Sequence, residues 1–404
     1  LLYLKLKNSE YFDEIIKKIV RYFYPSINKY FVYFISGFVA VANLIKFNNK
    51  GLPVIQEYLI SYEFGFIRRG LLGSFFNLLS NNIFTISYLY IPLLIIFVHY
   101  FYTLLVLKLY QHSNISPFDI LIIFSPSLIG YQIYTISGGP ANKEIFGLIS
   151  LLIISVALKV KKINLYLIGA FLLNISFYIH EVNLLFVVVM LYLLKDKKYF
   201  NIISISTFIN LIVFLYRYFN TDNVEIIAKK LCSEYFDKFP DMGCGKSYYL
   251  EQDFSSSINM VSSTVLSDYQ YFLVYGFYFL LAILPFILNK FYKHNKFYLI
   301  FIFFNILPLF VIAIDWGRWL FILSNLFMII YFQNNDELKK VSVNIYLPYL
   351  VIFGLSYLIL WRVPYCCVGD LNLIYLLRVN KFNISFFFPI ASFIVLRYYD
   401  KVNE

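Results

Sequence analysis

Long apolar runs, separated by short polar or charged turns, make up most of the chain after residue 30. A helix needs about 20 apolar residues to cross a bilayer, so runs of this kind predict membrane-spanning helices. The pattern predicts twelve spans, at 31–46, 87–107, 117–136, 145–158, 163–179, 182–194, 201–218, 269–288, 297–314, 318–332, 343–360 and 382–396. Several runs are shorter than a full span, and residues 163–194 also fit one long tilted helix.

The remaining segments complete the expected organisation. Residues 1–30 mix basic and apolar residues, as an amphipathic segment on the cytoplasmic membrane surface does. The transmembrane domain is expected at 31–396, with a large loop inserted at 219–268 and a cytoplasmic tail at 397–404. We therefore expect an all-α, polytopic helical bundle with about 12 transmembrane helices, an N-terminal interfacial helix and one outer loop of about 50 residues.

The composition supports this class of protein. The 404 residues are 60% hydrophobic and only 14% charged, with a mean hydropathy of +0.71, whereas soluble domains are roughly 25% charged. In a membrane protein Lys and Arg usually orient the spans. The net charge of +11 therefore does not indicate a nucleic-acid partner.

Basic residues gather in the short turns on one side of the predicted bundle. The turns at 159–162 and 195–198 are rich in lysine, and cytoplasmic loops carry such an excess. We therefore expect both termini in the cytoplasm and the 219–268 loop outside. Cys232 and Cys244 share that loop and can pair in an oxidising compartment, although the sequence leaves open whether they do.

The first candidate motif on the outer side is EFGFIRRG at 63–70. The planar guanidinium groups of Arg68 and Arg69 match phosphate oxygens, which favours a clamp for a phosphate or pyrophosphate. Glu63 lies in the same motif and is a candidate proton acceptor. The alternative is a surface helix, continuing after Gly70, whose arginines only anchor to lipid phosphates.

The second motif is SGGPANKEIF at 137–146, at the boundary between two predicted spans. Asn142 is a candidate cap, and Lys143 and Glu144 fall in the first turn of the next helix. A helix N-terminus with a nearby lysine can hold an anion. The alternative is an ordinary turn in which Glu144 complements the helix dipole.

The third motif, FYIHEVNLL at 177–185, places His180 and Glu181 within a long apolar stretch. Ionisable groups in such a position are functional candidates, although a short outer turn would expose both to water. Glu181 is the favoured general base, because no basic residue lies near it in sequence to lower its pKa. His180 would orient it or share the proton, and Glu63 is the second choice.

The fourth motif is DWGRW at 315–319, between two strongly apolar runs. Asp315 and Arg318 are spaced for a helical ion pair, which would make Asp315 a poor base. Trp316 and Trp319 fit a stacking platform for a sugar ring, with Arg318 as a further phosphate ligand. The alternative is a capped turn with an ion pair and two tryptophans at the membrane interface.

The sequence contains no recognisable metal or nucleotide motif. The four histidines are scattered, with no Cys or His spacing typical of zinc sites. A P-loop and a Rossmann glycine fingerprint are both missing from the sequence. We therefore expect no cofactor, no metal and no ATP-driven transport.

The architecture and the motifs EFGFIRRG (63–70) and DWGRW (315–319) resemble bacterial O-antigen or capsule repeat-unit polymerases. The architecture is also similar to polyprenyl-linked membrane glycosyltransferases of the GT-C type, which place an acidic residue in the first outer loop. Glu57 and Glu63 lie in the corresponding segment, but the Asp-Asp or Asp-Glu pair of that class is missing.

The resemblance implies a function and a location. The protein would polymerise undecaprenyl-pyrophosphate-linked oligosaccharides at the periplasmic face of the bacterial inner membrane, as a metal-independent enzyme. Cations would stabilise the departing pyrophosphate, and a carboxylate or His would accept the hydroxyl proton. Membrane lipids and a chain-length regulator protein are the further partners that the resemblance suggests.

Three alternatives stay open. A flippase for the same lipid-linked sugars should line a path across the membrane with charge, whereas the predicted ionisable groups gather at one end. An O-antigen ligase or outer-face acyltransferase differs from a polymerase in its acceptor, which the sequence does not specify. The last alternative is a non-catalytic membrane partner in an export complex.

Overall fold

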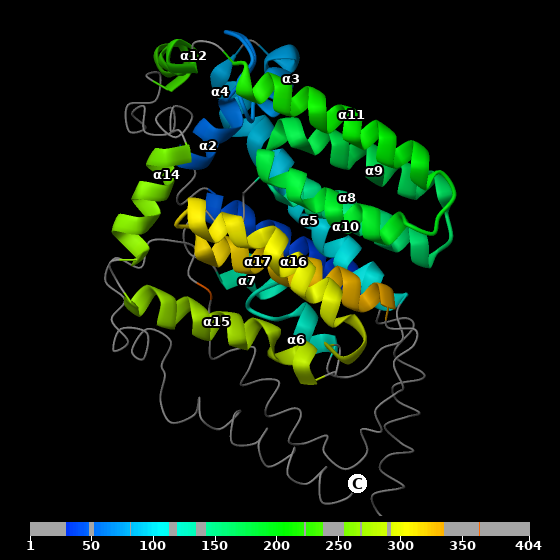
Figure 1. Ribbon diagram of the computed structural model, residues 1–404. Helices are drawn as coiled ribbons and strands as arrows, with labels where there is room; N and C mark the ends of the chain where they lie inside the picture. Colours follow the sequence, from blue (N-terminus) through cyan, green and yellow to red (C-terminus); the bar gives the residue numbers. More distant parts are fainter. Residues whose placement is uncertain are drawn as a thin grey trace, which may run out of the picture.

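The computed structural model describes residues 30–47, 52–80, 82–112, 119–134, 143–221, 224–236, 254–266, 269–288, 292–334 and residue 363. Every regular element within these ranges is helical, and they contain no strand (Figure 1). The all-α expectation is therefore confirmed for this part of the chain. The predicted interfacial segment, the last two predicted spans and the C-terminal tail lie outside the described residues.

Three described helices are long and apolar enough to cross a membrane, namely Tyr30–Phe47, Ile83–Gln111 and Phe200–Phe219. Shorter apolar helices lie at Ile145–Lys159, Ile163–Ile179, Glu181–Leu194, Tyr271–Ile287 and Phe297–Ile312. These helices indicate a membrane protein. The number of spans and their orientation stay predictions.

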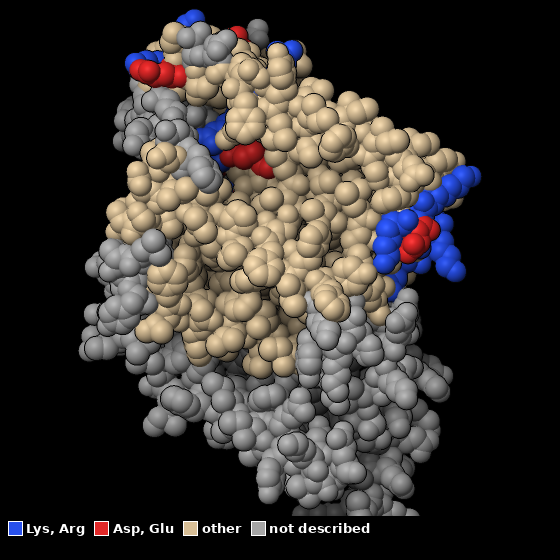
Figure 2. Space-filling model, viewed as in Figure 1, with Lys and Arg blue, Asp and Glu red and all other residues tan. Residues whose placement is uncertain are grey.

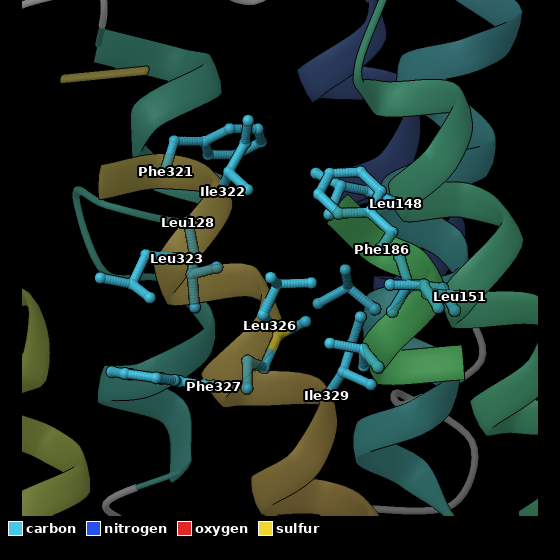
Figure 3. Close-up of a cluster of buried hydrophobic side chains, with 14 of the residues drawn as sticks. Leu128, Leu148, Leu151, Phe186, Phe321, Ile322, Leu323, Leu326, Phe327 and Ile329 are labelled. Carbon is cyan, nitrogen blue, oxygen red and sulfur yellow. The ribbon is translucent and has the colours of Figure 1, made fainter. Parts of the chain in front are cut away.

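The centre of the bundle is α17 (Trp316–Asn334), whose residues from Trp316 to Phe332 are all buried. It packs against α15 (Tyr269–Leu288), α16 (Tyr292–Ile312) and α8 (Ile145–Lys159). Figure 3 shows Leu326 and Ile329 of α17 on the side that faces Leu148 and Leu151 of α8, while Leu323 and Phe327 point to the other side. A helix that is apolar on all sides is stable only when neighbours surround it, so α17 fixes the positions of the helices around it.

Among the described helices, α8 and α9 (Ile163–Ile179) are packed together most extensively. Gly169 allows this approach, because a Cβ there would lie 2.6 Å from Ile154 Cγ1. α8 also packs against α5 (Ile91–Gln111), and α9 packs against α11 (Phe200–Phe219). The α8–α9 pair thus connects the central helix to the outer layer.

The helical conformation is interrupted at His180, between α9 and the next helical segment. This residue is extended, with φ −159° and ψ 128°, and its Nδ1 accepts a hydrogen bond from the Val182 N–H. A 3₁₀ helix, η3 (Glu181–Phe186), and then α10 (Val187–Leu194) follow. The single long helix considered for 163–194 is therefore wrong, and the break is a capped helix start.

The predicted single helix at 117–136 is also wrong. The described part of this stretch forms two short helices, α6 (Asp119–Ile123) and α7 (Ile129–Tyr134). Pro126 lies between them, and a proline disfavours a helical conformation at the residue before it. The Ser125 carbonyl accepts hydrogen bonds from Leu128 N at 2.8 Å and Gly130 N at 3.1 Å, which stabilises the turn.

The loop predicted at 219–268 contains helices in its described parts. These are α12 (Val224–Leu231), η4 (Cys232–Phe236), α14 (Phe254–Val261) and η5 (Ser262–Leu266). Ile227 and Leu231 of α12 join a buried apolar cluster with Ile67 and Ile179. Cys232 is disulfide-bonded, and Cys244, its expected partner, lies outside the described residues.

A buried charged cluster as the candidate functional site

Ionisable side chains from five parts of the chain meet at one end of the bundle. They come from α2 (Leu52–Leu59), the loop before α3 (Leu71–Leu79), the start of α8, the break at His180 and the start of α17. We call this set the charged cluster. It consists of Glu57, Arg68, Arg69, Lys143, Glu144, His180, Glu181, Asp315 and Arg318.

The outer part of the charged cluster centres on Arg69 and Glu181. Arg69 Nε lies 2.9 Å from Glu181 Oε2, and Arg69 Nη2 lies 2.6 Å from Oε1. This is the two-bond geometry that makes arginine–carboxylate pairs strong. Arg68 Nη1 is 3.7 Å from Glu181 Oε1, and Glu57 Oε1 is 3.5 Å from Arg69 Nη1.

The backbone of Arg69 is held in an uncommon conformation. Its φ is 70°, in the left-handed region that non-glycine residues rarely adopt. The buried Lys143 donates a hydrogen bond from Nζ to the Arg69 carbonyl at 3.0 Å. Gly70 follows, where a Cβ would lie 2.3 Å from the Tyr62 ring. Such strain persists only where the surroundings fix it. The surrounding residues therefore hold this loop in a conformation that directs the Arg69 side chain toward Glu181.

Lys143 occupies a fully buried position beside the Arg69 loop. Burial lowers its pKa to about 7, because a low-dielectric interior disfavours the ammonium form, and the nearby Arg69 acts in the same direction. The Glu57 carboxylate opposes this shift. Lys143 is therefore near its midpoint of protonation at neutral pH.

The inner part of the charged cluster contains His180, Glu144 and Arg318. Arg318 forms an ion pair with Glu144, which is only 2% exposed. His180 Nε2 lies 3.2 Å from Glu144 Oε1, while Nδ1 accepts the backbone N–H of Val182. Arg318 Nη2 also lies 3.1 Å from His180 Nε2, and a guanidinium group can only donate hydrogen bonds.

His180 is neutral in this environment, because burial together with the positive charge of Arg69 lowers its pKa to about 3. It lies outside the three described helices that are long enough to span a membrane. Asp315 completes the inner part, with Oδ2 at 3.2 Å from Arg318 Nη1. This contact confirms the ion pair predicted from the spacing of the two residues.

The structure brings together most of the side chains that the sequence singled out. The residues that meet in the charged cluster are Arg68, Arg69, Lys143, His180, Glu181, Asp315 and Arg318. Glu63 is not among them: its side chain is exposed and accepts a hydrogen bond from Asn77 at 3.1 Å. It is therefore a poor candidate for the second-choice base.

The two tryptophans predicted as a sugar-stacking platform are buried. Trp316 and Trp319 are only 8% and 3% exposed, and they form part of the bundle core. The indole N–H groups donate to the carbonyls of Phe310 and Ala313. Arg318 lies over the Trp319 ring at 5.0 Å. Both rings are thus committed to packing at the start of α17.

The expectation of a raised pKa for Glu181 is also wrong. Burial by itself would raise it, but Arg69 and His180, with the Arg69 hydrogen bonds, hold the pKa well below its usual value. Arg69 is far from Glu181 in sequence, so the local pattern gave no sign of this contact. In this state Glu181 is a weak proton acceptor.

Two carboxylates of the charged cluster, Glu57 and Glu144, were not among the main site residues predicted from the sequence. Glu144 was assigned only to the helix dipole, yet it is the buried partner of Arg318. Glu57 was considered as the acidic residue of the first outer loop, and it lies buried beside Arg69. The available signal was a lone Glu within the apolar segment LPVIQEYL, because such a residue requires a partner.

The charged cluster has an open side and a closed side. The side chains of Arg68, Arg69, Glu181 and Asp315 are between 18% and 23% exposed, whereas His180 and Glu144 are at most 2% exposed. Figure 2 shows acidic and basic side chains together in a hollow below α12. An anion can therefore reach the guanidinium groups without unpacking the core.

Metal binding has no support in the described part of the chain, where no group of three or more His, Cys, Asp and Glu side chains is arranged to hold an ion. The carboxylates of the charged cluster instead contact guanidinium groups. The chemistry that this arrangement supports is binding of an anion and transfer of a proton.

Comparisons of the chain with protein-family models, with curated proteins and with solved structures gave no match.

Proposed function

We propose that this chain is a membrane glycosyltransferase that polymerises undecaprenyl-pyrophosphate-linked oligosaccharides at the periplasmic face of the bacterial inner membrane. The observation that carries the proposal is the charged cluster, in which two adjacent arginines are open at one end of an apolar bundle. A lipid-linked pyrophosphate needs this combination, because its lipid requires an apolar surface and its phosphates require cations.

Two features support the proposed orientation. The disulfide-bonded Cys232 follows α12, which packs on the same apolar cluster as Ile67 and Ile179, next to the charged cluster. Disulfides persist in oxidising compartments such as the periplasm. The lysine-rich turns lie at the other end of α8 and α9 (Figure 2), and an excess of lysine favours the cytoplasmic side.

The proposed reaction breaks the bond between the anomeric carbon of the growing glycan and its pyrophosphate oxygen. A hydroxyl oxygen of the next unit forms the new bond to that carbon, its proton passes to a carboxylate, and the pyrophosphate leaves with the electron pair. Arg68 and Arg69 would stabilise the departing pyrophosphate. The proton acceptor should be a carboxylate on the open side, which leaves Glu181 and Asp315.

The test is polymerisation by the purified full chain in lipid nanodiscs, supplied with a lipid-linked repeat unit and followed by gel. We expect a ladder of products with the parent and an Arg69→Lys rate about 100-fold lower, because lysine keeps the charge but loses the two-bond geometry. Arg217→Lys, at an exposed arginine of α11, is the matched control and should polymerise normally. No ladder with the parent would contradict the proposal.

A gene deletion separates the related activities in the cell. Lipopolysaccharide with a single repeat unit on its core would support the polymerase. Lipopolysaccharide with none would point to the ligase or to the flippase.

The flippase is the second candidate function because polar groups are also buried deeper in the bundle. Lys46 Nζ donates to the Gln132 carbonyl at 2.6 Å, and the Gln132 side chain lies 3.0 Å from His99 Nδ1. Asp119 accepts a hydrogen bond from Tyr331. The expectation that ionisable groups gather only at one end is therefore wrong for the described residues, and interior polar groups are typical of transport paths.

A further inference from the structure

The side chain of Glu181 occupies the position on Arg69 that a phosphate group would take. Its two oxygens accept from Nε and Nη2 of Arg69 at 2.9 and 2.6 Å. Carboxylate and phosphate groups both present paired oxygens to the planar guanidinium group. A phosphate and Glu181 therefore compete for the same donors.

The charges of the site add a second constraint. Among the described residues the charged cluster has four carboxylates against four basic side chains, namely Arg68, Arg69, Lys143 and Arg318. The cations at most balance the carboxylates, since Lys143 is partly neutral near pH 7. A dianionic ligand would leave an excess of negative charge in a site that is mostly out of water, which is unfavourable.

We propose that Glu181 is an internal anion that occupies Arg69 in the ligand-free protein, that a pyrophosphate oxygen displaces it, and that the released carboxylate takes up one proton from bulk water. The inference rests on the proposed function for the chemistry of the ligand. It adds that binding of the lipid-linked donor is coupled to protonation of Glu181, which leaves Asp315 as the carboxylate on the open side that accepts the hydroxyl proton.

The surroundings of Glu181 favour both steps. Its side chain is 18% exposed and that of Arg69 is 22% exposed, so the pair can separate without opening the core. Once separated, Glu181 loses its two-bond partner and faces the neutral His180 and the ligand itself, while the carboxylate of Glu57 lies on the other side of the Arg69 guanidinium contact, 3.5 Å from Nη1. Nearby negative charge raises the proton affinity of a carboxylate, while Arg68 and Lys143 are the cations that oppose this.

The test uses the full chain in nanodiscs and P1,P2-dimethyl diphosphate, a soluble pyrophosphate diester whose two charges do not titrate near neutrality. Calorimetry at pH 7.5 in two buffers of different ionisation enthalpy gives the number of protons taken up on binding. We expect about one proton with the parent and less than half of that with Glu181→Gln. We also expect Glu181→Gln to bind the diester about tenfold more tightly, because the competing anion is gone.

Glu225→Gln is the matched control, since Glu225 is an exposed carboxylate paired with Lys229 on α12. It should bind the diester with the affinity and the proton uptake of the parent. If the Glu181→Gln variant fails to fold, the proton uptake measured on the parent alone still tests the inference. Because binding takes up a proton, affinity should fall as pH rises from 7 to 9, by at most about tenfold per pH unit.

The possible results separate this inference from the proposed function. Proton uptake that persists in Glu181→Gln would assign the proton to another group of the charged cluster, such as Lys143, and overturn the inference. Diester binding by the parent without proton uptake would also overturn it and would leave the glycosyltransferase proposal intact. The expected coupling without any polymerisation would overturn the proposed function alone, and no binding by any variant would overturn both.

Discussion

The two ends of the α8–α9 pair both carry charge, but in different forms. At one end the charges are of mixed sign, buried and in contact with each other, as in the Arg318–Glu144 pair. At the other end the turns expose Lys161, Lys162, Lys195, Lys197 and Lys198 to solvent, a basic patch visible on the right of Figure 2. Burying a charge is costly unless it is paired, so each buried charge at the mixed end needs a specific partner of opposite sign. Exposed lysines need only be basic to orient the chain.

The largest expected difference between the two ends is in stability. Arg318→Met leaves the 2% exposed Glu144 without its ion-pair partner, and we expect a loss of about 3–5 kcal/mol in the free energy of unfolding. Unfolding of the full chain in detergent measures this. The double variant Arg318→Met/Glu144→Gln should recover most of the loss, because the deeply buried unpaired carboxylate is gone and Asp315, the other partner of Arg318, is partly exposed.

Lys161→Met at the exposed end is the control for this prediction, and it should change stability by less than about 0.5 kcal/mol. A large loss in Lys161→Met, or no recovery in the double variant, would show that the contrast between the two ends is not one of paired burial.

A smaller difference is expected in the dependence of stability on pH. The pKa of Lys143 is about 7 in the folded protein and has its ordinary, higher value in the unfolded chain. Between these values the unfolded state binds more protons, so the contribution of Lys143 to stability rises with pH, by at most about 1.4 kcal/mol per pH unit. Below pH 7 this contribution is constant.

Comparison with Lys143→Met isolates this term. The stability of the parent relative to Lys143→Met should increase from pH 7 to pH 9 in denaturant titrations. The same comparison with Lys161→Met should be flat. A difference between the parent and Lys143→Met that stays flat over this range would mean that Lys143 is charged in the folded protein throughout.

The smallest effect is expected from neutralising the exposed end. Lys197→Gln/Lys198→Gln should leave the rate of the proposed polymerisation and the unfolding temperature nearly unchanged, because both side chains are exposed. Its consequence should be in topology. In the parent we expect reporter fusions at residues 50 and 240 to read outside and one at 335 to read inside. The double variant should give a mixed result at 335. Loss of the enzymatic rate without mixed topology would place a functional role at the lysine turns.

The bounds of a helix were predictable where a local sequence pattern determines them. The predicted spans at 163–179 and 269–288 agree with α9 and α15, because long apolar runs end at polar or basic turns in both cases. The Asp315–Arg318 pair was predictable for the same reason, since three-residue spacing places both on one side of a helix. Pro126 is visible in the sequence, but the apolar run around it favoured the prediction of one continuous helix.

The pairing within the charged cluster was not predictable from local pattern. Glu181 meets Arg69, and Glu144 meets Arg318, only because α8, α9 and α17 pack together. The residues of the site were therefore largely foreseen, whereas the protonation of Glu181 was not. The burial of Trp316 and Trp319 also depends on tertiary packing, with Tyr271 and Phe310 around the Trp316 ring.

The Glu144–Arg318 pair has a consequence for biosynthesis. The ribosome makes Glu144 long before Arg318, so a nascent chain that already contains α8 lacks the cation that neutralises Glu144 in the finished protein. Until α17 is inserted, Glu144 has to stay hydrated or protonated, and α8 cannot settle into its final environment. Chains truncated before residue 318 are therefore expected to be recognised by membrane proteases, which would link the assembly of the charged cluster to the quality control of the whole protein.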